Sequence, residues 1–152
     1  MWIRILGVAF AIVLSASFMT ACSSDPNDCD PGATCQCTGV GTCTRNCTGE
    51  GCKVTVSGVG TATYTCTDGK CEGTFSGEGS STVNCAGGGC KITSTGTGDV
   101  VLNCAGGGCS LTCTGTGECA IKGCLKDCTA ACTGTGECTQ TCTDATCKTT
   151  NS

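Results

Sequence analysis

The stretch CKVTVSGVGTATYTCTDGKC, residues 52–71, decides the fold of this chain. On both sides of Gly58-Val59-Gly60, apolar and polar residues alternate, as expected for β-strands with one buried face. The glycines permit a sharp turn, and Thr67-Asp68-Gly69-Lys70 supplies a second turn. The stretch therefore predicts a unit of strand, turn, strand and turn. The apolar residues of this alternation, which we expect on the buried face, are Cys52, Val54, Val56, Ala62, Tyr64 and Cys66.

The same unit recurs with a period of 19 residues. Two cysteine series follow this spacing, namely Cys47, Cys66, Cys85 and Cys104, and Cys52, Cys71, Cys90, Cys109, Cys128 and Cys147. A Gly-x-Gly turn keeps the same period at Gly39/Gly41, Gly58/Gly60, Gly77/Gly79, Gly96/Gly98, Gly115/Gly117 and Gly134/Gly136. The first series would continue at position 123, but Gly123 stands there and the cysteine, Cys124, follows one place later. A fixed period near 20 residues marks a repeat architecture.

Two all-β architectures suit this repeat. A meander of repeated β-hairpins would leave one apolar face of a long sheet uncovered. A β-solenoid folds each repeat into one coil and buries it against its neighbours. We expect an all-β, disulfide-stapled β-solenoid of about six 19-residue coils, with the meander as the alternative. At ~4.8 Å per rung, the rod would be about 25–30 Å long.

The N-terminal segment has a different character from the repeats. Arg4 gives the start a positive charge, and residues 5–18 form a continuous apolar run. This order is typical of a secretory signal peptide, and the run is shorter than the roughly 20 residues that a membrane-spanning helix needs. Thr20-Ala21-Cys22 then resembles the lipobox of bacterial lipoproteins, although Met19 stands where leucine is usual.

The lipoprotein resemblance implies that the chain is cleaved between Ala21 and Cys22 and that Cys22 is lipidated. More than one acyl chain on a residue gives stable membrane anchoring, whereas one chain gives only marginal binding. Ser23 replaces the aspartate that retains enterobacterial lipoproteins in the inner membrane, so we expect the outer membrane or cell surface of a bacterium. The expected parts are a signal peptide (1–21), a lipidated tether (22–28) and a cysteine-rich β repeat domain (29–152).

The cysteine count agrees with this arrangement. The chain has 21 cysteines and few aromatic residues; assigning Cys22 to the lipid leaves an even number. A chain with a small hydrophobic core uses disulfides in an oxidising compartment. Connectivity does not follow from sequence, and a rival links the ends of one coil, such as Cys52 to Cys66. Sequential neighbours would pair as Cys29–Cys35, Cys37–Cys43, Cys47–Cys52, Cys66–Cys71, Cys85–Cys90, Cys104–Cys109, Cys113–Cys119, Cys124–Cys128, Cys132–Cys138 and Cys142–Cys147.

Composition disfavours several classes of function. The net charge is −4 and the lysines are dispersed, which argues against nucleic acid as a partner. Without histidine, the usual activation of a Ser or Cys nucleophile is missing, so we expect no enzyme and no cofactor. Asp99, Glu118 and Glu137 recur after the second turn glycine and are interpreted as solvated carboxylates. Cys35-Gln36-Cys37 has metallothionein-like spacing, which leaves soft-metal binding as an alternative although we expect no metal site.

Hydroxyl side chains recur at the polar positions of the alternation in the first strand of each repeat. This pattern resembles the ice-binding face of insect antifreeze proteins, whose repeats are shorter. We expect a membrane-anchored envelope lipoprotein that acts as a rigid structural, adhesive or binding module for an unknown protein or envelope partner, with ice binding as an alternative. The two candidate columns are Thr55, Thr74, Thr93 and Thr112, and Ser57, Ser76, Thr95 and Thr114, which Thr38 and Thr133 continue.

Overall fold

The computed structural model of the chain describes residues 27–152. The expected signal peptide, its cleavage site and the lipidation of Cys22 lie outside the described residues. The described part contains fourteen β-strands and no helix, and therefore no helix of the length and apolarity needed to cross a membrane. The all-β class predicted from the alternating pattern is confirmed.

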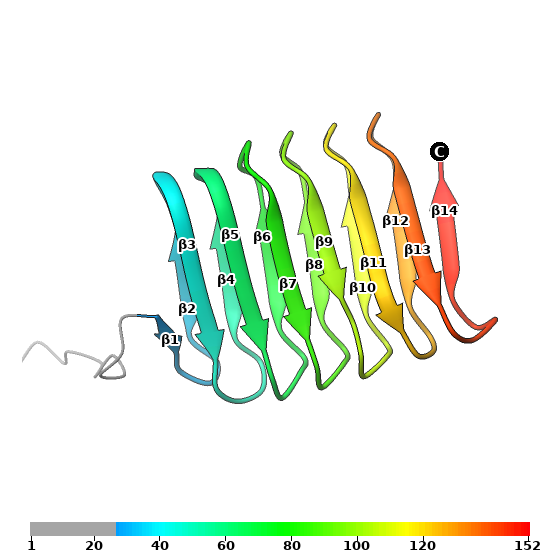
Figure 1. The fold of residues 1–152 in the computed structure, drawn as a ribbon, viewed down its shortest axis with the longest axis horizontal. Coiled ribbons are helices and arrows are strands. Elements are labelled where there is room, and N and C mark those ends of the chain that lie inside the picture. The colour runs from blue at the N-terminus through cyan, green and yellow to red at the C-terminus, as the bar shows by residue number, and fades with distance from the viewer. Residues whose placement is uncertain (1–26) are drawn as a thin grey trace, which may run out of the picture.

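The strands form two parallel sheets that face each other along a rod (Figure 1). Sheet A contains β1 (Asp28–Cys29), β3 (Val40–Cys47), β5 (Val59–Cys66), β7 (Ser81–Cys85), β9 (Val100–Asn103), β11 (Cys119–Cys124) and β13 (Cys138–Cys142). Sheet B contains β2 (Thr34–Cys37), β4 (Lys53–Val56), β6 (Glu72–Phe75), β8 (Lys91–Ser94), β10 (Ser110–Cys113), β12 (Thr129–Cys132) and β14 (Lys148–Asn151).

The strand register reproduces the sequence period. Thr55 pairs with Thr74, and Thr74 with Thr93, so each strand lies on the equivalent strand of the previous coil. Sequence neighbours such as β4 and β5 belong to different sheets, and strand pairs within a sheet are parallel. The β-solenoid is confirmed, and the hairpin meander is wrong because it requires antiparallel neighbours.

Each sheet has seven strands, so a single strand at each end flanks six complete two-strand coils, from β2–β3 to β12–β13. At the C-terminus, β14 continues the register on β12 beyond the last cysteine, with Lys148 opposite Thr129. At the N-terminus, the two-residue strand β1 pairs with the end of β3, with Cys29 opposite Cys47. β1 contains Cys29, where the expected six coils begin, whereas β14 follows Cys147, where they end.

The displaced Cys124 results from a compensated irregularity. In β11 the register on β13 shifts between Ile121 and Cys124, and Gly123 adopts a left-handed conformation (φ 66°), as in a β-bulge with one extra residue. The next turn is one residue shorter, because Cys124 and Cys128 are separated by four positions where other bridges at this edge span five. The extra residue is thus absorbed within one coil.

Between the sheets lies a narrow core with a turn region at each side. Its largest fully buried side chains include Tyr64, Ile92, Leu102, Leu111 and Ile121. One side, which we call the cysteine edge, contains the turns 48–51, 67–70, 86–89, 105–108, 125–127 and 143–146 with their flanking cysteines. The opposite side, the glycine edge, contains the six Gly-x-Gly turns.

Close stacking at the glycine edge requires glycine. A Cβ atom added to Gly96 would meet the carbonyl oxygen of Gly77, and one added to Gly115 would meet that of Gly96. Gly134 stands in the same relation to Gly115. Each turn therefore rests on the backbone of the previous one, and a side chain would separate the coils.

Candidate functional site

The ten disulfides of the described chain join sequential cysteine neighbours, from Cys29–Cys35 to Cys142–Cys147. Each bridge crosses from one sheet to the other, and the bridged Cα atoms are between 5.9 and 6.6 Å apart. These separations lie within the range that a disulfide spans. The rival pairing of Cys52 with Cys66 is wrong, because these cysteines bond to Cys47 and Cys71.

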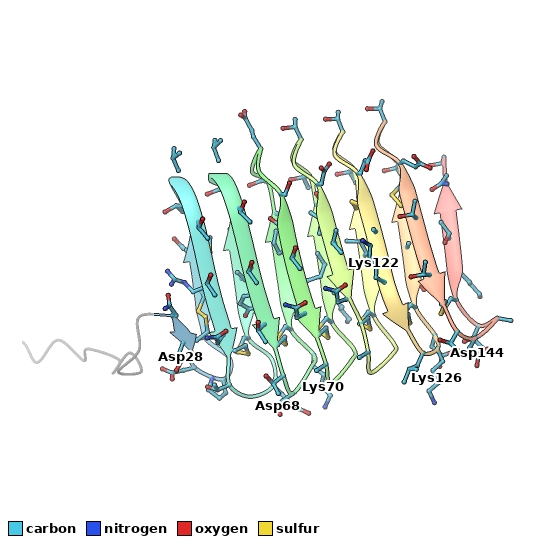
Figure 2. The ribbon with its side chains drawn as sticks, in the orientation of Figure 1. Asp28, Asp68, Lys70, Lys122, Lys126 and Asp144 are labelled. Atoms are coloured by element: carbon cyan, nitrogen blue, oxygen red, sulfur yellow. A yellow bond between two sulfur atoms is a disulfide. The ribbon has the colours of Figure 1, made fainter. Side chains whose placement is uncertain are left out.

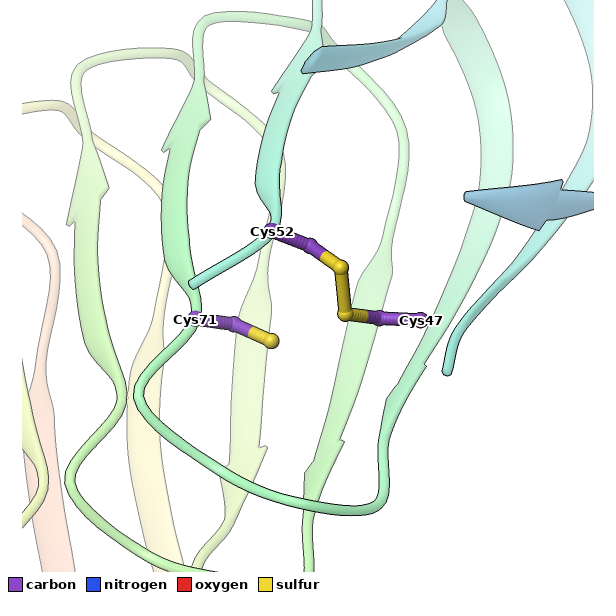
Figure 3. Close-up of side chains that lie close together, drawn as sticks. All are labelled: Cys47, Cys52 and Cys71. Atoms are coloured by element: carbon purple, nitrogen blue, oxygen red, sulfur yellow. A yellow bond between two sulfur atoms is a disulfide. The ribbon is translucent and has the colours of Figure 1, made fainter. Parts of the chain in front are cut away.

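At the cysteine edge the bridges form a continuous column of sulfur atoms. Figure 3 shows Cys71 beside the Cys47–Cys52 bridge of the preceding coil, and the three Sγ atoms lie within 4.8 Å of one another. The same stacking places Cys128 Sγ 3.7 Å from Cys104 Sγ. The bridges in this column are Cys47–Cys52, Cys66–Cys71, Cys85–Cys90, Cys104–Cys109, Cys124–Cys128 and Cys142–Cys147.

These sulfur clusters are oxidised. Thiolate, not disulfide, is the metal-binding form of cysteine, and every cysteine in residues 27–152 is disulfide-bonded. The Cys35-Gln36-Cys37 pair is divided between two bridges, to Cys29 and to Cys43. Soft-metal binding would therefore require these bridges to be reduced first.

The recurring carboxylates lie where the glycine edge meets sheet A. Asp99, Glu118 and Glu137 are exposed. Asp99 Oδ1 accepts a hydrogen bond of 2.9 Å from the backbone N–H of Glu118 in the next coil. This contact gives the Asp99 carboxylate a structural role at the turn, in agreement with its interpretation as a solvated carboxylate.

Both hydroxyl columns lie on the outer face of sheet B, which we call the hydroxyl face. Thr55, Thr74, Thr93 and Thr112 occupy directly paired positions on β4, β6, β8 and β10. The second column lies just past the strand ends, but its backbone continues the ladder, since the Thr95 N–H donates to the Phe75 carbonyl at 2.8 Å. Neighbouring residues within one column are therefore about 4.8 Å apart, from coil to coil, and the two columns are about 6.7 Å apart along the strand.

The hydroxyl face has defined limits. Gln36 and Ala131 interrupt the first column near its ends. The second column extends beyond Thr133 to Ser152, whose backbone N–H donates to Cys132. On the cysteine-edge side, a row of charged residues borders the hydroxyl columns, with Lys53 Nζ 3.6 Å from Glu72 Oε2. Other charged side chains project outward from the cysteine edge itself, among them Asp68, Lys70, Lys126 and Asp144 (Figure 2).

A second polar array had not been predicted. The outer face of sheet A presents threonines and asparagines in the same register, such as Thr63 opposite Thr82 and Thr65 opposite Asn84. Asn103 Nδ2 donates to Asn84 Oδ1 at 2.8 Å, so this array contains hydrogen bonds between coils. In the sequence, this array is indicated by the polar residues that alternate with apolar ones in the second strand of each repeat. Val101, Ala120 and Lys122 occupy this face toward the C-terminus.

Tyr64 is the one buried side chain of the described residues whose polar atom lacks a hydrogen-bond partner. Its hydroxyl lies within the core of the second complete coil, and its side chain is 2% exposed. Burial raises the pKa of this phenol to about 12, because the charged phenolate would lose its hydration. In the strand register, Tyr64 lies opposite Arg45 on β3 and Val83 on β7, and its burial between these strands indicates a packing role.

Comparison with protein-family models, with curated proteins and with solved structures gave no match.

Proposed function

We propose that this chain is an exported, non-enzymatic rod of the bacterial cell envelope that presents its hydroxyl face to an envelope partner. The ten disulfides support export, because such bridges form and persist in oxidising compartments. In this proposal, lipid on Cys22 holds the rod at the outer membrane or cell surface through the tether 22–28. The partner is a protein or another envelope component rather than nucleic acid, since the chain has a net charge of −4.

The observation that carries this proposal is the alignment of the two hydroxyl columns across successive coils. Thr74 and Thr93 are directly paired and exposed. Backbone ladders and bridges hold them in place, so little conformational entropy would be lost on binding. Their side chains are uncharged, which suits a regular polar surface rather than a highly charged ligand.

The binding role is tested with charges placed on the hydroxyl face. Thr74→Lys with Thr93→Lys should weaken binding of the chain to isolated outer-membrane and cell-wall fragments by at least about tenfold, the equivalent of about 1.4 kcal/mol. The matched control is Thr63→Lys with Thr82→Lys on sheet A, which should leave binding unchanged. Equal losses in both variants, or no loss in either, would contradict the proposal.

The anchoring is tested separately in the full chain. Cells supplied with a labelled palmitate analogue should incorporate the label into the wild type and process its N-terminus. Cys22→Ala should carry no label and should keep residues 1–21. Retention of the label in this variant would remove lipidation of Cys22 from the proposal and leave the binding face untouched.

Ice binding is the second candidate, favoured by the repeated two-column spacing of the hydroxyl face. Threonine supplies both a hydroxyl and a methyl group, and a flat array of both suits a regular ice surface. Thermal hysteresis and ice-crystal shaping should then be measurable at high protein concentration and should disappear with Thr74→Lys and Thr93→Lys. Absence of both effects in the wild type would eliminate this candidate.

A further inference from the structure

Sulfur atoms of successive disulfides at the cysteine edge are in contact, so that a thiolate released from one bridge lies next to the sulfur atoms of the preceding bridge. Cys147 Sγ is 3.8 Å from Cys124 Sγ, and Cys128 Sγ is 3.7 Å from Cys104 Sγ. In both contacts, the second cysteine of one bridge approaches the preceding bridge. Toward the N-terminus the second cysteine of each bridge lies within 4.8 Å of both sulfur atoms of the preceding bridge, in the groups Cys85/Cys90/Cys109, Cys66/Cys71/Cys90 and Cys47/Cys52/Cys71.

The column is accessible from one end. Cys142 and Cys147 are partly exposed, whereas the other ten cysteines of the column, from Cys47 to Cys128, are at most 1% exposed. A thiol in solution therefore reaches the column at its C-terminal bridge. From there, the remaining sulfurs are accessible only through their neighbours.

We infer that the cysteine edge is a thiol–disulfide relay, in which attack by an external thiol releases a thiolate whose position is then transferred toward the N-terminal end. The external thiolate attacks Cys142 Sγ, forms a mixed disulfide and releases the Cys147 thiolate. Cys147 then bonds to Cys124 while the Cys124–Cys128 bond breaks. The released Cys128 thiolate attacks Cys104 in the same way and frees Cys109.

Each step forms one S–S bond and breaks one, as in ordinary thiol–disulfide exchange. Three further steps, at Cys85, Cys66 and Cys47, transfer the thiolate to Cys90, Cys71 and finally Cys52. There it takes up the proton that the external thiol lost. A buried free cysteine behaves as a small hydrophobic residue, so the core accommodates the resulting thiol. The external thiol is the only reactant consumed.

The glycine edge provides an internal contrast, because its bridges do not form a continuous column. Cys132 approaches the Cys113–Cys119 bridge, with the three sulfurs within 4.8 Å. The preceding coil has Ser94 paired with Cys113, and Val100 paired with Cys119. Exchange at this edge stops there for lack of a neighbouring sulfur.

The relay is tested on the full chain, purified in detergent from membranes of an exporting bacterium. The chain is exposed to one equivalent of 2-mercaptoethanol, quenched in acid and unfolded in excess N-ethylmaleimide, and the labelled residues are mapped by peptide mass spectrometry. Label should reach the second cysteine of each buried bridge and leave the first cysteine unlabelled. The expected positions are Cys128, Cys109, Cys90, Cys71 and Cys52.

A variant lacking one bridge tests the direction of transfer. In Cys104→Ala with Cys109→Ala, label should stop at Cys128, while circular dichroism should report the same β content as the wild type. Label confined to Cys142 and Cys147 in the wild type would overturn the relay. So would equal labelling of both cysteines in the buried bridges, or label beyond Cys128 in the variant.

Discussion

The two edges of the rod close the same coils by different means. At the cysteine edge each successive coil is closed by its own disulfide, and these bridges form an unbroken column from Cys47–Cys52 to Cys142–Cys147. At the glycine edge, bridges occur toward the ends of the rod, in Cys37–Cys43, Cys113–Cys119 and Cys132–Cys138.

Between these bridges, side-chain packing closes the glycine edge. Val56 pairs with Cys37 and Ala62 with Cys43, so the two residues occupy bridge positions without a bridge. The same two positions hold Phe75 and Ser81 in the next coil, and Ser94 and Val100 in the coil after it. An inner coil has neighbours on both sides, whereas a coil near the end of the rod has fewer stacking contacts. The difference teaches that side-chain packing can close an inner coil at the glycine edge without a bridge, although the inner coil that contains Cys113–Cys119 has one.

Breaking the glycine stack should have the largest effect on stability. In Gly96→Ala the new methyl group would meet the Gly77 carbonyl, and separating the coils would disturb several backbone hydrogen bonds. We expect a loss of more than about 3 kcal/mol in the free energy of unfolding, measured by guanidinium denaturation with the bridges intact. The control Thr97→Ala changes the exposed residue of the same turn and should cost less than about 0.5 kcal/mol. Equal stability of the two variants would contradict the packing argument.

Removing one bridge from the cysteine edge should cost less. Cys85→Ala with Cys90→Ala opens a short loop, for which the loop-entropy model predicts a loss of about 2 kcal/mol. Denaturation of the wild type and the variant under non-reducing conditions measures the difference. A loss as large as that of Gly96→Ala would mean that the edges contribute equally per coil.

Adding a bridge at the glycine edge tests the same comparison in the opposite direction. Val56→Cys with Ala62→Cys places cysteines in register with Cys37 and Cys43, whose Cα atoms are 5.9 Å apart. Loop closure should stabilise the fold, while loss of the Val56 side chain offsets part of the gain, leaving about 1 kcal/mol. The thermal midpoint of the oxidised variant should exceed that of the same variant after alkylation of the two new thiols. An unchanged midpoint would show that packing already closes this coil fully.

Between the edges, Tyr64→Phe should stabilise the core by about 1 kcal/mol, because it removes a buried hydroxyl without a partner. The raised pKa of about 12 means that the folded state favours the neutral phenol. The associated stability is complete below pH 10 and is lost as the pH rises through 12. Since Tyr64 is the only tyrosine, the ultraviolet titration of the folded chain should have its midpoint near 12, and a midpoint near 10 would contradict this burial.

The smallest effect is expected within one turn of the cysteine edge. Lys70 has φ 57°, whereas Gly89 and Gly108 hold the same left-handed conformation in the next turns. Lys70→Gly should relieve strain, lose an exposed ion pair to Glu50 and gain about 0.5 kcal/mol overall. The reciprocal Gly89→Lys should cost a similar amount in the same denaturation assay. Destabilisation by Lys70→Gly would show that its ion pair outweighs the backbone conformation, and no loss in Gly89→Lys would contradict the strain argument.

Much of the architecture was predictable because its causes are local. Alternation in residues 52–66 indicated which side chains are buried, and the bridge partners are near one another in sequence. The hydroxyl columns followed from the same parity. The array containing Thr63 and Asn84 follows from the same alternation in the second strand of each repeat.

By itself, the sequence determined the 19-residue unit, its two turns and the inward position of the cysteines, since these depend on residue spacing and side-chain direction. Only the tertiary structure decided that equivalent strands pair in parallel. Strand pairing depends on contacts between residues far apart in sequence, and all the strands show the same alternation. It also decided the bulge at Gly123 and the end strands β1 and β14, which depend on the fit between neighbouring coils. The sulfur column has the same origin, since the 3.7–3.8 Å approaches at Cys104 and Cys124 arise only when coils stack in register.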